Sequence, residues 1–144
     1  MPTTTFRSDV AAGLYALAAG FQAANPTMLH NAYRARPATF SDRPLAFVGP
    51  RTETIVHTNQ IRQRSMRPTI VLVWAYNDEL EVADVRDDVV DAFLDYATAR
   101  PHAISSNTVT APTGVEDVEL EMDGAFYPAS IVTFGDTLIQ EGRA

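Results

Sequence analysis

The stretch Thr69-Ile70-Val71-Leu72-Val73-Trp74-Ala75-Tyr76 decides the fold of this chain. Successive side chains of a strand point to opposite faces, so Thr69, Val71, Val73 and Ala75 share one face of this stretch and Ile70, Leu72, Trp74 and Tyr76 share the other. Both faces are apolar. A β-branched run without a polar face is typical of a strand that is covered on both sides, so we predict a strand at the centre of a sheet.

An amphipathic helix is predicted directly after this strand, over about residues 81–100. Its apolar residues recur at spacings of three and four: Val82, Val85, Val89, Phe93 and Tyr96. Asp78 and Glu81 fit a capping box at its start, and Pro101 fits its end. We expect the apolar stripe to pack against one face of the sheet.

A second helix is predicted at residues 6–24, where Val10, Leu14, Leu17 and Phe21 have helical spacing and Asn25-Pro26 follows. Gly13 and Gly20 interrupt it, and each weakens an isolated helix by about 1 kcal/mol relative to alanine. Two interpretations remain open. The glycines mark a close approach to a neighbouring element, or they are merely tolerated.

The other segments favour short strands and hairpins. Strands are predicted at residues 28–34, 45–48, 53–57, 118–122 and 127–134. The polar segment 58–67 is interpreted as the tip and return of a long hairpin whose second arm becomes the central strand, and Asp123-Gly124 is the strongest turn signal. We therefore predict an α/β (α+β) fold, with one mixed, mainly antiparallel sheet and two main helices, in a single domain spanning residues 1–144.

Composition narrows the class of protein. A chain of 144 residues that is 46% hydrophobic fits one domain with a core of its own. The absence of cysteine excludes disulfides, thiol catalysis and cysteine-bound metal. No signal-peptide pattern and no apolar run of roughly 20 residues is present, so we expect a cytosolic protein when it is made.

The net charge of −7 is unevenly distributed. Residues 1–77 hold eight arginines and three carboxylates, a balance of +5, whereas residues 78–144 hold three arginines and fifteen carboxylates, a balance of −12. Such an asymmetry bears on association with partners rather than on the fold.

No motif in the chain indicates catalysis, a cofactor or a metal. His30, His57 and His102 lie in three different segments without metal-binding spacing. Asp84, Asp88, Asp91 and Asp95 line one side of the predicted helix; a metal site is one interpretation, and a solvated or subunit-contacting face is the favoured one. The arginines at 62–67 suit phosphate, but the overall acidity argues against a dedicated nucleic-acid binder. We expect no catalytic, cofactor or metal residues and no enzymatic activity.

A family resemblance rests on the order of several weak motifs along nearly the whole chain. They are the Ser8-Asp9 helix, Tyr33-Arg34-Ala35-Arg36-Pro37, Pro44-Leu45-Ala46-Phe47-Val48, Glu53-Thr54-Ile55, Arg62-Gln63-Arg64-Ser65-Met66-Arg67-Pro68-Thr69, the apolar strand and the aspartate-rich helix. In this order the chain resembles tail terminator proteins of long-tailed (siphovirus-type) phages that infect actinobacteria.

The resemblance implies a structural virion protein without cofactors, located in the neck region of the tail and in the host cytoplasm during assembly. Its partners would be further copies in a hexameric ring, the major tail tube protein and a head-tail connector or neck protein. Viral DNA would pass through the ring without sequence-specific binding, and no membrane would be involved. A neck or head-completion protein is the alternative within this class. A small enzyme of unknown chemistry is the alternative from another class, and a nucleic-acid-binding adaptor is the third.

The charge asymmetry and the resemblance together suggest an interface. A ring joins one surface of each subunit to a different surface of the next. We expect Arg62, Arg64 or Arg67 to face Asp84, Asp88 or Asp91 across the boundary between subunits. The segment 58–67 is expected to contact a neighbouring subunit or the tail tube.

Overall fold

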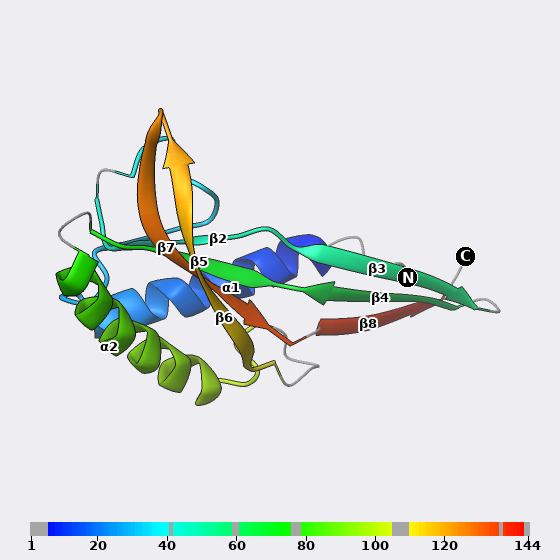
Figure 1. The fold of residues 1–144 in the computed structure, drawn as a ribbon. Coiled ribbons are helices and arrows are strands. Elements are labelled where there is room, and N and C mark those ends of the chain that lie inside the picture. Colours follow the sequence, from blue (N-terminus) through cyan, green and yellow to red (C-terminus); the bar gives the residue numbers. More distant parts are fainter. Residues whose placement is uncertain are drawn as a thin grey trace.

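The chain forms an α+β fold in the computed structural model, which describes residues 6–40, 42–58, 61–75, 79–104, 110–135 and 137–142. For residues 79–83 and 137–142 only the backbone is considered. The elements in chain order are α1 (Phe6–Ala24), β1 (Asn31–Tyr33), β2 (Leu45–Val48), β3 (Thr52–Thr58), β4 (Ile61–Arg67), β5 (Thr69–Val73), α2 (Glu79–Thr98), β6 (Pro112–Met122), β7 (Ala125–Phe134) and β8 (Thr137–Gly142). Figure 1 shows a body made of helices and a twisted sheet, from which a narrow arm of strands projects.

The body contains a five-stranded mixed sheet with the order β1-β2-β5-β7-β6. Strand β1 runs parallel to β2, and the other neighbours are antiparallel. Strand β5 occupies the central position, and Ile70, Val71, Leu72 and Val73 are all buried. The prediction of a central strand covered on both faces is therefore confirmed.

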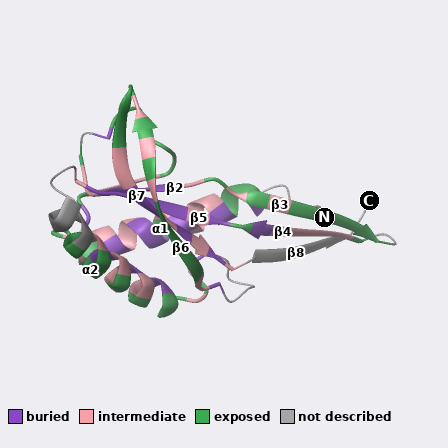
Figure 2. Ribbon diagram, viewed as in Figure 1, coloured by how far each residue is buried: buried purple, intermediate pink, exposed green. Residues whose placement is uncertain are grey.

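Each face of β5 contributes to a separate core. Ile70, Leu72 and Trp74 pack with buried residues of α1 and α2. Val71 and Val73 pack on the opposite face with Phe47 and with Phe40, which comes from the connection between β1 and β2. The purple segments of Figure 2 follow β5 and much of α1, whereas the arm strand β3 is green along most of its length.

Helix α2 follows the predicted stripe in part. Phe93 is fully buried, where its ring meets Phe21 of α1 edge-to-face with centroids 5.3 Å apart, and Val89 is buried nearby. Val85, however, is 48% exposed, so the expectation that it packs against the sheet was wrong. It lies two turns before Phe93, roughly 12 Å along the helix axis, beyond the contact with α1. Asp78 lies outside the described residues, as does the side chain of Val82.

The two glycines of α1 mark close approaches, which decides between the two interpretations. A Cβ at Gly13 would lie 2.6 Å from the carbonyl oxygen of Ile104 and 2.7 Å from its Cα. A Cβ at Gly20 would meet the hydroxyl of Tyr96. Glycine lowers the intrinsic stability of the helix, but it is required at these positions because α2 and the segment after it pack directly on the backbone of α1.

The predicted hairpin turn is also present. Asp123 and Gly124 both have positive φ angles, 53° and 80°, between β6 and β7. Positive values at both central residues define the type I′ turn, whose twist matches that of the flanking strands. The hairpin is longer than predicted at its first strand, because β6 begins at Pro112.

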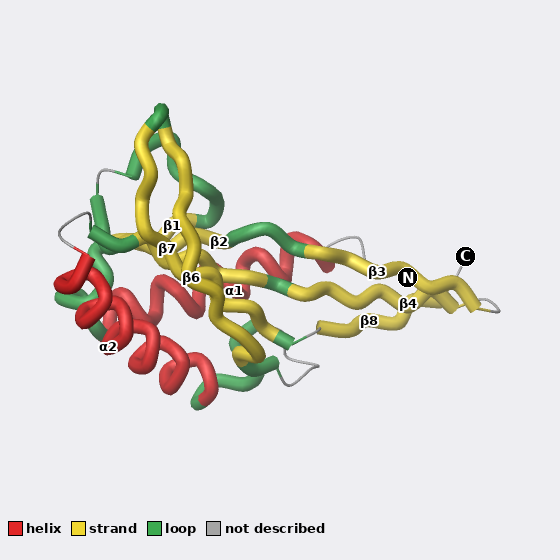
Figure 3. Tube along the Cα trace, viewed as in Figure 1, coloured by secondary structure: helices red, strands yellow, loops and turns green. Residues whose placement is uncertain are grey.

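The arm is a second, three-stranded sheet with the order β3-β4-β8. It continues the three middle strands of the body, since β2 leads to β3, β4 leads to β5, and β7 leads to β8 (Figures 1 and 3). The sequence predicted the β3–β4 hairpin and its run into the central strand, but it did not predict β8 or the separation of the sheets.

The break between body and arm has a local cause. Residues 49–51 stand opposite residues 68–69 in the register, so the outer strand carries one extra residue, as in a bulge. Pro50 and Pro68 lie at this level, and neither can donate a ladder hydrogen bond. Bonds from the Gly49 amide to the Thr69 carbonyl (3.0 Å) and from the Phe134 amide to the Pro68 carbonyl (3.0 Å) still join the strands there.

Shortening Phe93 tests the packing of α2. Phe93→Ala is expected to lower the free energy of unfolding by about 3–5 kcal/mol, because a fully buried ring is replaced by a cavity. Val85→Ala, on the same predicted stripe, is the control and is expected to change it by less than about 0.5 kcal/mol. Denaturant titration measures both values, and equal losses would contradict the arrangement described.

Alanine at each glycine of α1 separates two kinds of close contact. Gly13→Ala is expected to destabilise the protein by about 1–3 kcal/mol, because the new methyl group meets backbone atoms of Ile104 that cannot move alone. Gly20→Ala is expected to cost less, since Tyr96 meets the methyl with the far end of its side chain. Thermal unfolding compares the two, and a stabilised Gly13→Ala would show that the contact is loose.

Candidate interaction surface

The register of the arm assigns its side chains to two faces. Residues directly opposite one another in neighbouring strands point to the same face. One face therefore carries the pairs Glu53–Met66, Ile55–Arg64 and His57–Arg62, and we call it the charged face. The other carries Thr54–Ser65, Val56–Gln63 and Thr58–Ile61, with Thr52–Arg67 at its base.

The base of the charged face is fixed to α1 by an ion-pair cluster. Glu53 accepts hydrogen bonds from Nε of Arg64 at 2.5 Å and from an Nη of Arg7 at 2.7 Å. The Arg64 guanidinium also lies over the ring of Phe6, 5.0 Å from its centroid. The side chains of Glu53 and Arg64 are only 9% and 12% exposed, so this pair is shielded from water. The arm is thus held to the body by a charged contact on one face.

This cluster lowers the pKa of Glu53. The hydrogen bond from Arg64 is the largest cause, and Arg7 acts in the same direction, while burial opposes both. Hydrogen bonds to the ionised carboxylate favour the charged form. The structure therefore gives Arg64 a role within its own chain, where the sequence suggested only a contact with a neighbour.

The other predicted interface residues lie far apart in the fold. Arg62 shares the charged face with Arg64, whereas Arg67 pairs with Thr52 and lies on the opposite face, at the base of the arm. Asp84, Asp88 and Asp91 are exposed on α2, in the body. Figure 1 places α2 and the arm at opposite ends of the molecule, so arginines and aspartates meet only if they come from different molecules.

Exposed apolar residues on the arm were missed by the sequence analysis. Ile55 is 49% exposed and Val56 is 45% exposed, on opposite faces of β3, and Ile61 is exposed on β4. Their signal was present in the sequence, because two adjacent β-branched residues in a short strand place one apolar side chain on each face. A projecting strand with apolar residues on both faces is typical of a surface that another chain covers.

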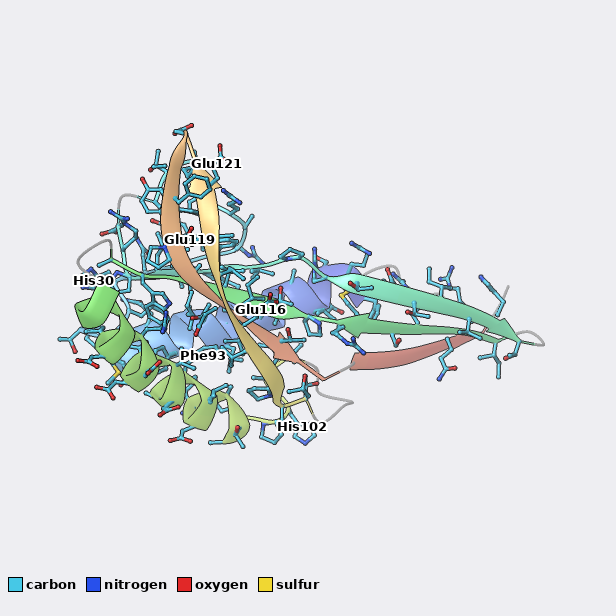
Figure 4. All side chains as sticks on the ribbon, in the orientation of Figure 1. His30, Phe93, His102, Glu116, Glu119 and Glu121 are labelled. Carbon is cyan, nitrogen blue, oxygen red and sulfur yellow. The ribbon has the colours of Figure 1, made fainter. Side chains whose placement is uncertain are left out.

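A second exposed surface lies on the β6–β7 hairpin. Glu116, Asp117, Glu119 and Glu121 are all exposed along β6, and the three glutamates are labelled in Figure 4. Phe126 is exposed near the tip. Arg36 from the β1–β2 connection donates a hydrogen bond to the Glu121 carbonyl and lies over the Phe40 ring, 5.2 Å from its centroid, which ties the hairpin to the body.

The groups that sequence reasoning considered for chemistry do not converge. His30, His57 and His102 are exposed on separate segments, and Figure 4 shows His30 and His102 far apart. Among the residues that the structure describes, no cluster of three or more histidine, aspartate and glutamate side chains suits a metal ion. Ser130 is fully buried, donates to Asp117 at 2.6 Å and accepts from Nε1 of Trp74 at 3.0 Å. This serine satisfies a buried indole and is closed to substrate.

Comparison with known proteins leaves the family open: no protein-family model matches the chain, and no curated protein matches its sequence. Within the described part of the chain, neither helix has the length and apolar character needed to cross a membrane.

The Glu53 cluster predicts a specific pH dependence. Because the folded-state pKa lies below the usual value of about 4.3, the stabilisation is fully present above that value and is lost as pH falls through the folded pKa. Glu53→Gln is expected to cost about 1–3 kcal/mol at pH 7 and progressively less below pH 4. Unfolding titrations across this range measure the difference, with the exposed Glu119→Gln as control. A pH-independent loss would mean that the ion pair contributes nothing.

Proposed function

We propose that this chain is a tail terminator, a structural protein that assembles as a ring on the finished tail tube of a long-tailed phage. The observation that carries the proposal is the arm: three strands leave the body, and beyond the contacts at its base the arm exposes Ile55, Val56 and Ile61 on β3 and β4. An arm of this kind is typical of a protein that binds other subunits in an assembly. The order of motifs along the chain resembles that of tail terminators, which favours a phage tail as this assembly.

The distribution of charge supports a ring. A closed ring is built from head-to-tail contacts, in which two different surfaces of the same protein meet. The arm, which carries Arg62, and helix α2, which carries the aspartates, lie at opposite ends of the molecule. Contacts of this kind between exposed groups contribute only about 0–1 kcal/mol each, so they set register and encounter rate rather than overall affinity.

In this proposal the ring ends tube polymerisation and offers its outer surface to the head connector. A hexamer that matches the tube would place the major tail tube protein on one side and a neck protein on the other, with DNA passing through the centre. Arg62 lies nearer the tip of the arm than Arg64, so the proposal assigns the contact with a neighbour to Arg62. A neck or head-completion protein is the second candidate, because it would use a ring of the same kind.

Charge reversal tests the ring. The wild-type chain is expected to reach a mass six times its 15.7 kDa as concentration rises, measured by light scattering after size exclusion. Arg62→Glu or Asp88→Arg alone is expected to weaken assembly, and the double variant is expected to restore it in part. Glu119→Arg is the control for added positive charge, and assembly should weaken with salt because screening acts over about 8 Å at physiological ionic strength.

The functional readout is tube length. Added to polymerising tail tube subunits of its own virus, the ring is expected to stop elongation, as seen by electron microscopy. A ring that binds finished tubes without stopping growth would favour the neck protein. A chain that stays monomeric up to about millimolar concentration and leaves tube growth unchanged would refute both.

A further inference from the structure

The edges of the two sheets are treated differently. In the body, β2 is flanked by β1 and β7 is flanked by β6. In the arm, the same strands continue as β3 and β8, and no described strand flanks either of them. Among the described residues, the arm therefore presents two open edges, each with a row of backbone amides and carbonyls that can pair with another strand.

The body's own edges are blunted. Strand β1 has only three residues. Strand β6 carries a register irregularity between Pro112 and Gly114, and its outer part bears four exposed carboxylates: Glu116, Asp117, Glu119 and Glu121. Short length, bulges and charge are the devices by which proteins keep edge strands from pairing.

Strand β3 has none of these devices. Its sequence, Thr52-Glu53-Thr54-Ile55-Val56-His57-Thr58, contains no proline and no lysine, and its register with β4 is unbroken. Its one acidic group, Glu53, is already bound by Arg64 and Arg7 on the side of α1. From Thr54 outward the strand is uncharged apart from His57 and rich in β-branched residues. It is the kind of edge that pairs with another chain.

We propose that the open edge of β3 pairs with the open edge of β8 in a second copy of this chain, so that the arms join into one continuous sheet between subunits. The inference rests on the proposed ring and assigns its joint to the edges of the arms in place of the contact between Arg62 and Asp88, because arms that lie side by side keep Arg62 away from the neighbour's α2. Both strands run antiparallel to β4, so they run parallel to each other. Copies related by rotation, with their arms pointing the same way, then bring β3 beside the neighbouring β8 in parallel orientation. Lengths of seven and six residues match.

A head-to-tail pairing of this kind continues the order β3-β4-β8 from one subunit into the next without a gap. It leaves no open edge when the ring closes, which removes the liability that each arm carries alone. The alternative, β3 against β3 about a two-fold axis, would use one edge twice and leave both β8 edges open.

The first test places a charge at the edge. Val56→Lys is expected to leave the circular dichroism and melting temperature of the monomer unchanged and to reduce the assembled fraction at least tenfold at a concentration where the wild type forms rings. Val115→Lys is the matched control, because Val115 is 40% exposed, close to the 45% of Val56, and lies on the edge strand of the other sheet. It is expected to assemble like the wild type.

A second test addresses the backbone. Successive amides of an edge strand point alternately to the partner strand and to the open side. Of Ile55→Pro and Val56→Pro, one is expected to remain folded while losing assembly, and the other to weaken the β3–β4 pairing itself. Normal rings from the folded variant would overturn the proposal.

Mixing distinguishes the two geometries. A Val56→Lys subunit keeps its β8 edge, so in head-to-tail pairing it binds one wild-type neighbour and stops the chain. A one-to-one mixture is then expected to contain fewer closed rings than the wild-type half alone. If Val56→Lys is inert in the mixture, or if it forms rings by itself, the β3–β8 pairing is wrong while the proposed ring stands. A wild-type chain that never assembles would instead refute the proposed function.

Discussion

The burial of both faces of β5 is the constraint on which the rest of the structure depends. One face needs the two helices, and the other needs the β1–β2 connection with Phe40, so each core fixes a different part of the chain. Because β5 is also the direct continuation of β4, whatever fixes β5 fixes the start of the arm. The apolar body thus acts as a clamp on the central strand of an element that extends beyond it.

The arm needs this clamp because it has little core of its own. Met66, at its base, is fully buried with Phe6 and the helix-side residues of the body. Farther out, Ile55 and Val56 remain exposed, so the outer arm gains little from the removal of apolar surface from water. Backbone pairing to β4 on both sides and the contact of Glu53 with Arg64 and Arg7 hold it. The arm is therefore anchored at its base and exposed toward its tip.

Local patterns predicted the parts of the fold that local chemistry determines. Three patterns each predict a structure from a few neighbouring residues, and all three predictions are confirmed. They are the apolar run around Val71, the helical spacing of Leu14 and Phe21, and the Asp123-Gly124 turn. Helical spacing failed at Val85 because exposure depends on where α1 ends beneath α2, which no local pattern records.

Contacts between distant residues were the other source of error. Strand β8 exists only through its pairing with β4, and the break between the sheets reflects a register difference between strands that are far apart in sequence. Of the expected interface residues, Arg64 has its partner Glu53 eleven residues away across a hairpin. The sequence contains several carboxylates that could pair with each arginine, and no local pattern identifies Glu53 as the partner of Arg64.

The edge strands of the two sheets differ in the side chains that they carry. Strand β6, at the edge of the body, bears a row of exposed carboxylates, which disfavours pairing with another strand. Strand β3, at the edge of the arm, carries β-branched residues instead. A chain that associates through any edge would be expected to have two apolar edge strands. A chain that stays monomeric would be expected to have two charged ones. In the proposed pairing, association is confined to the arm, and growth is directional because the two open edges belong to different strands. Directional growth with a fixed rotation between copies closes on itself or continues without end, and in the proposed assembly the like charge of the acidic bodies opposes contacts between them other than the one through the arm.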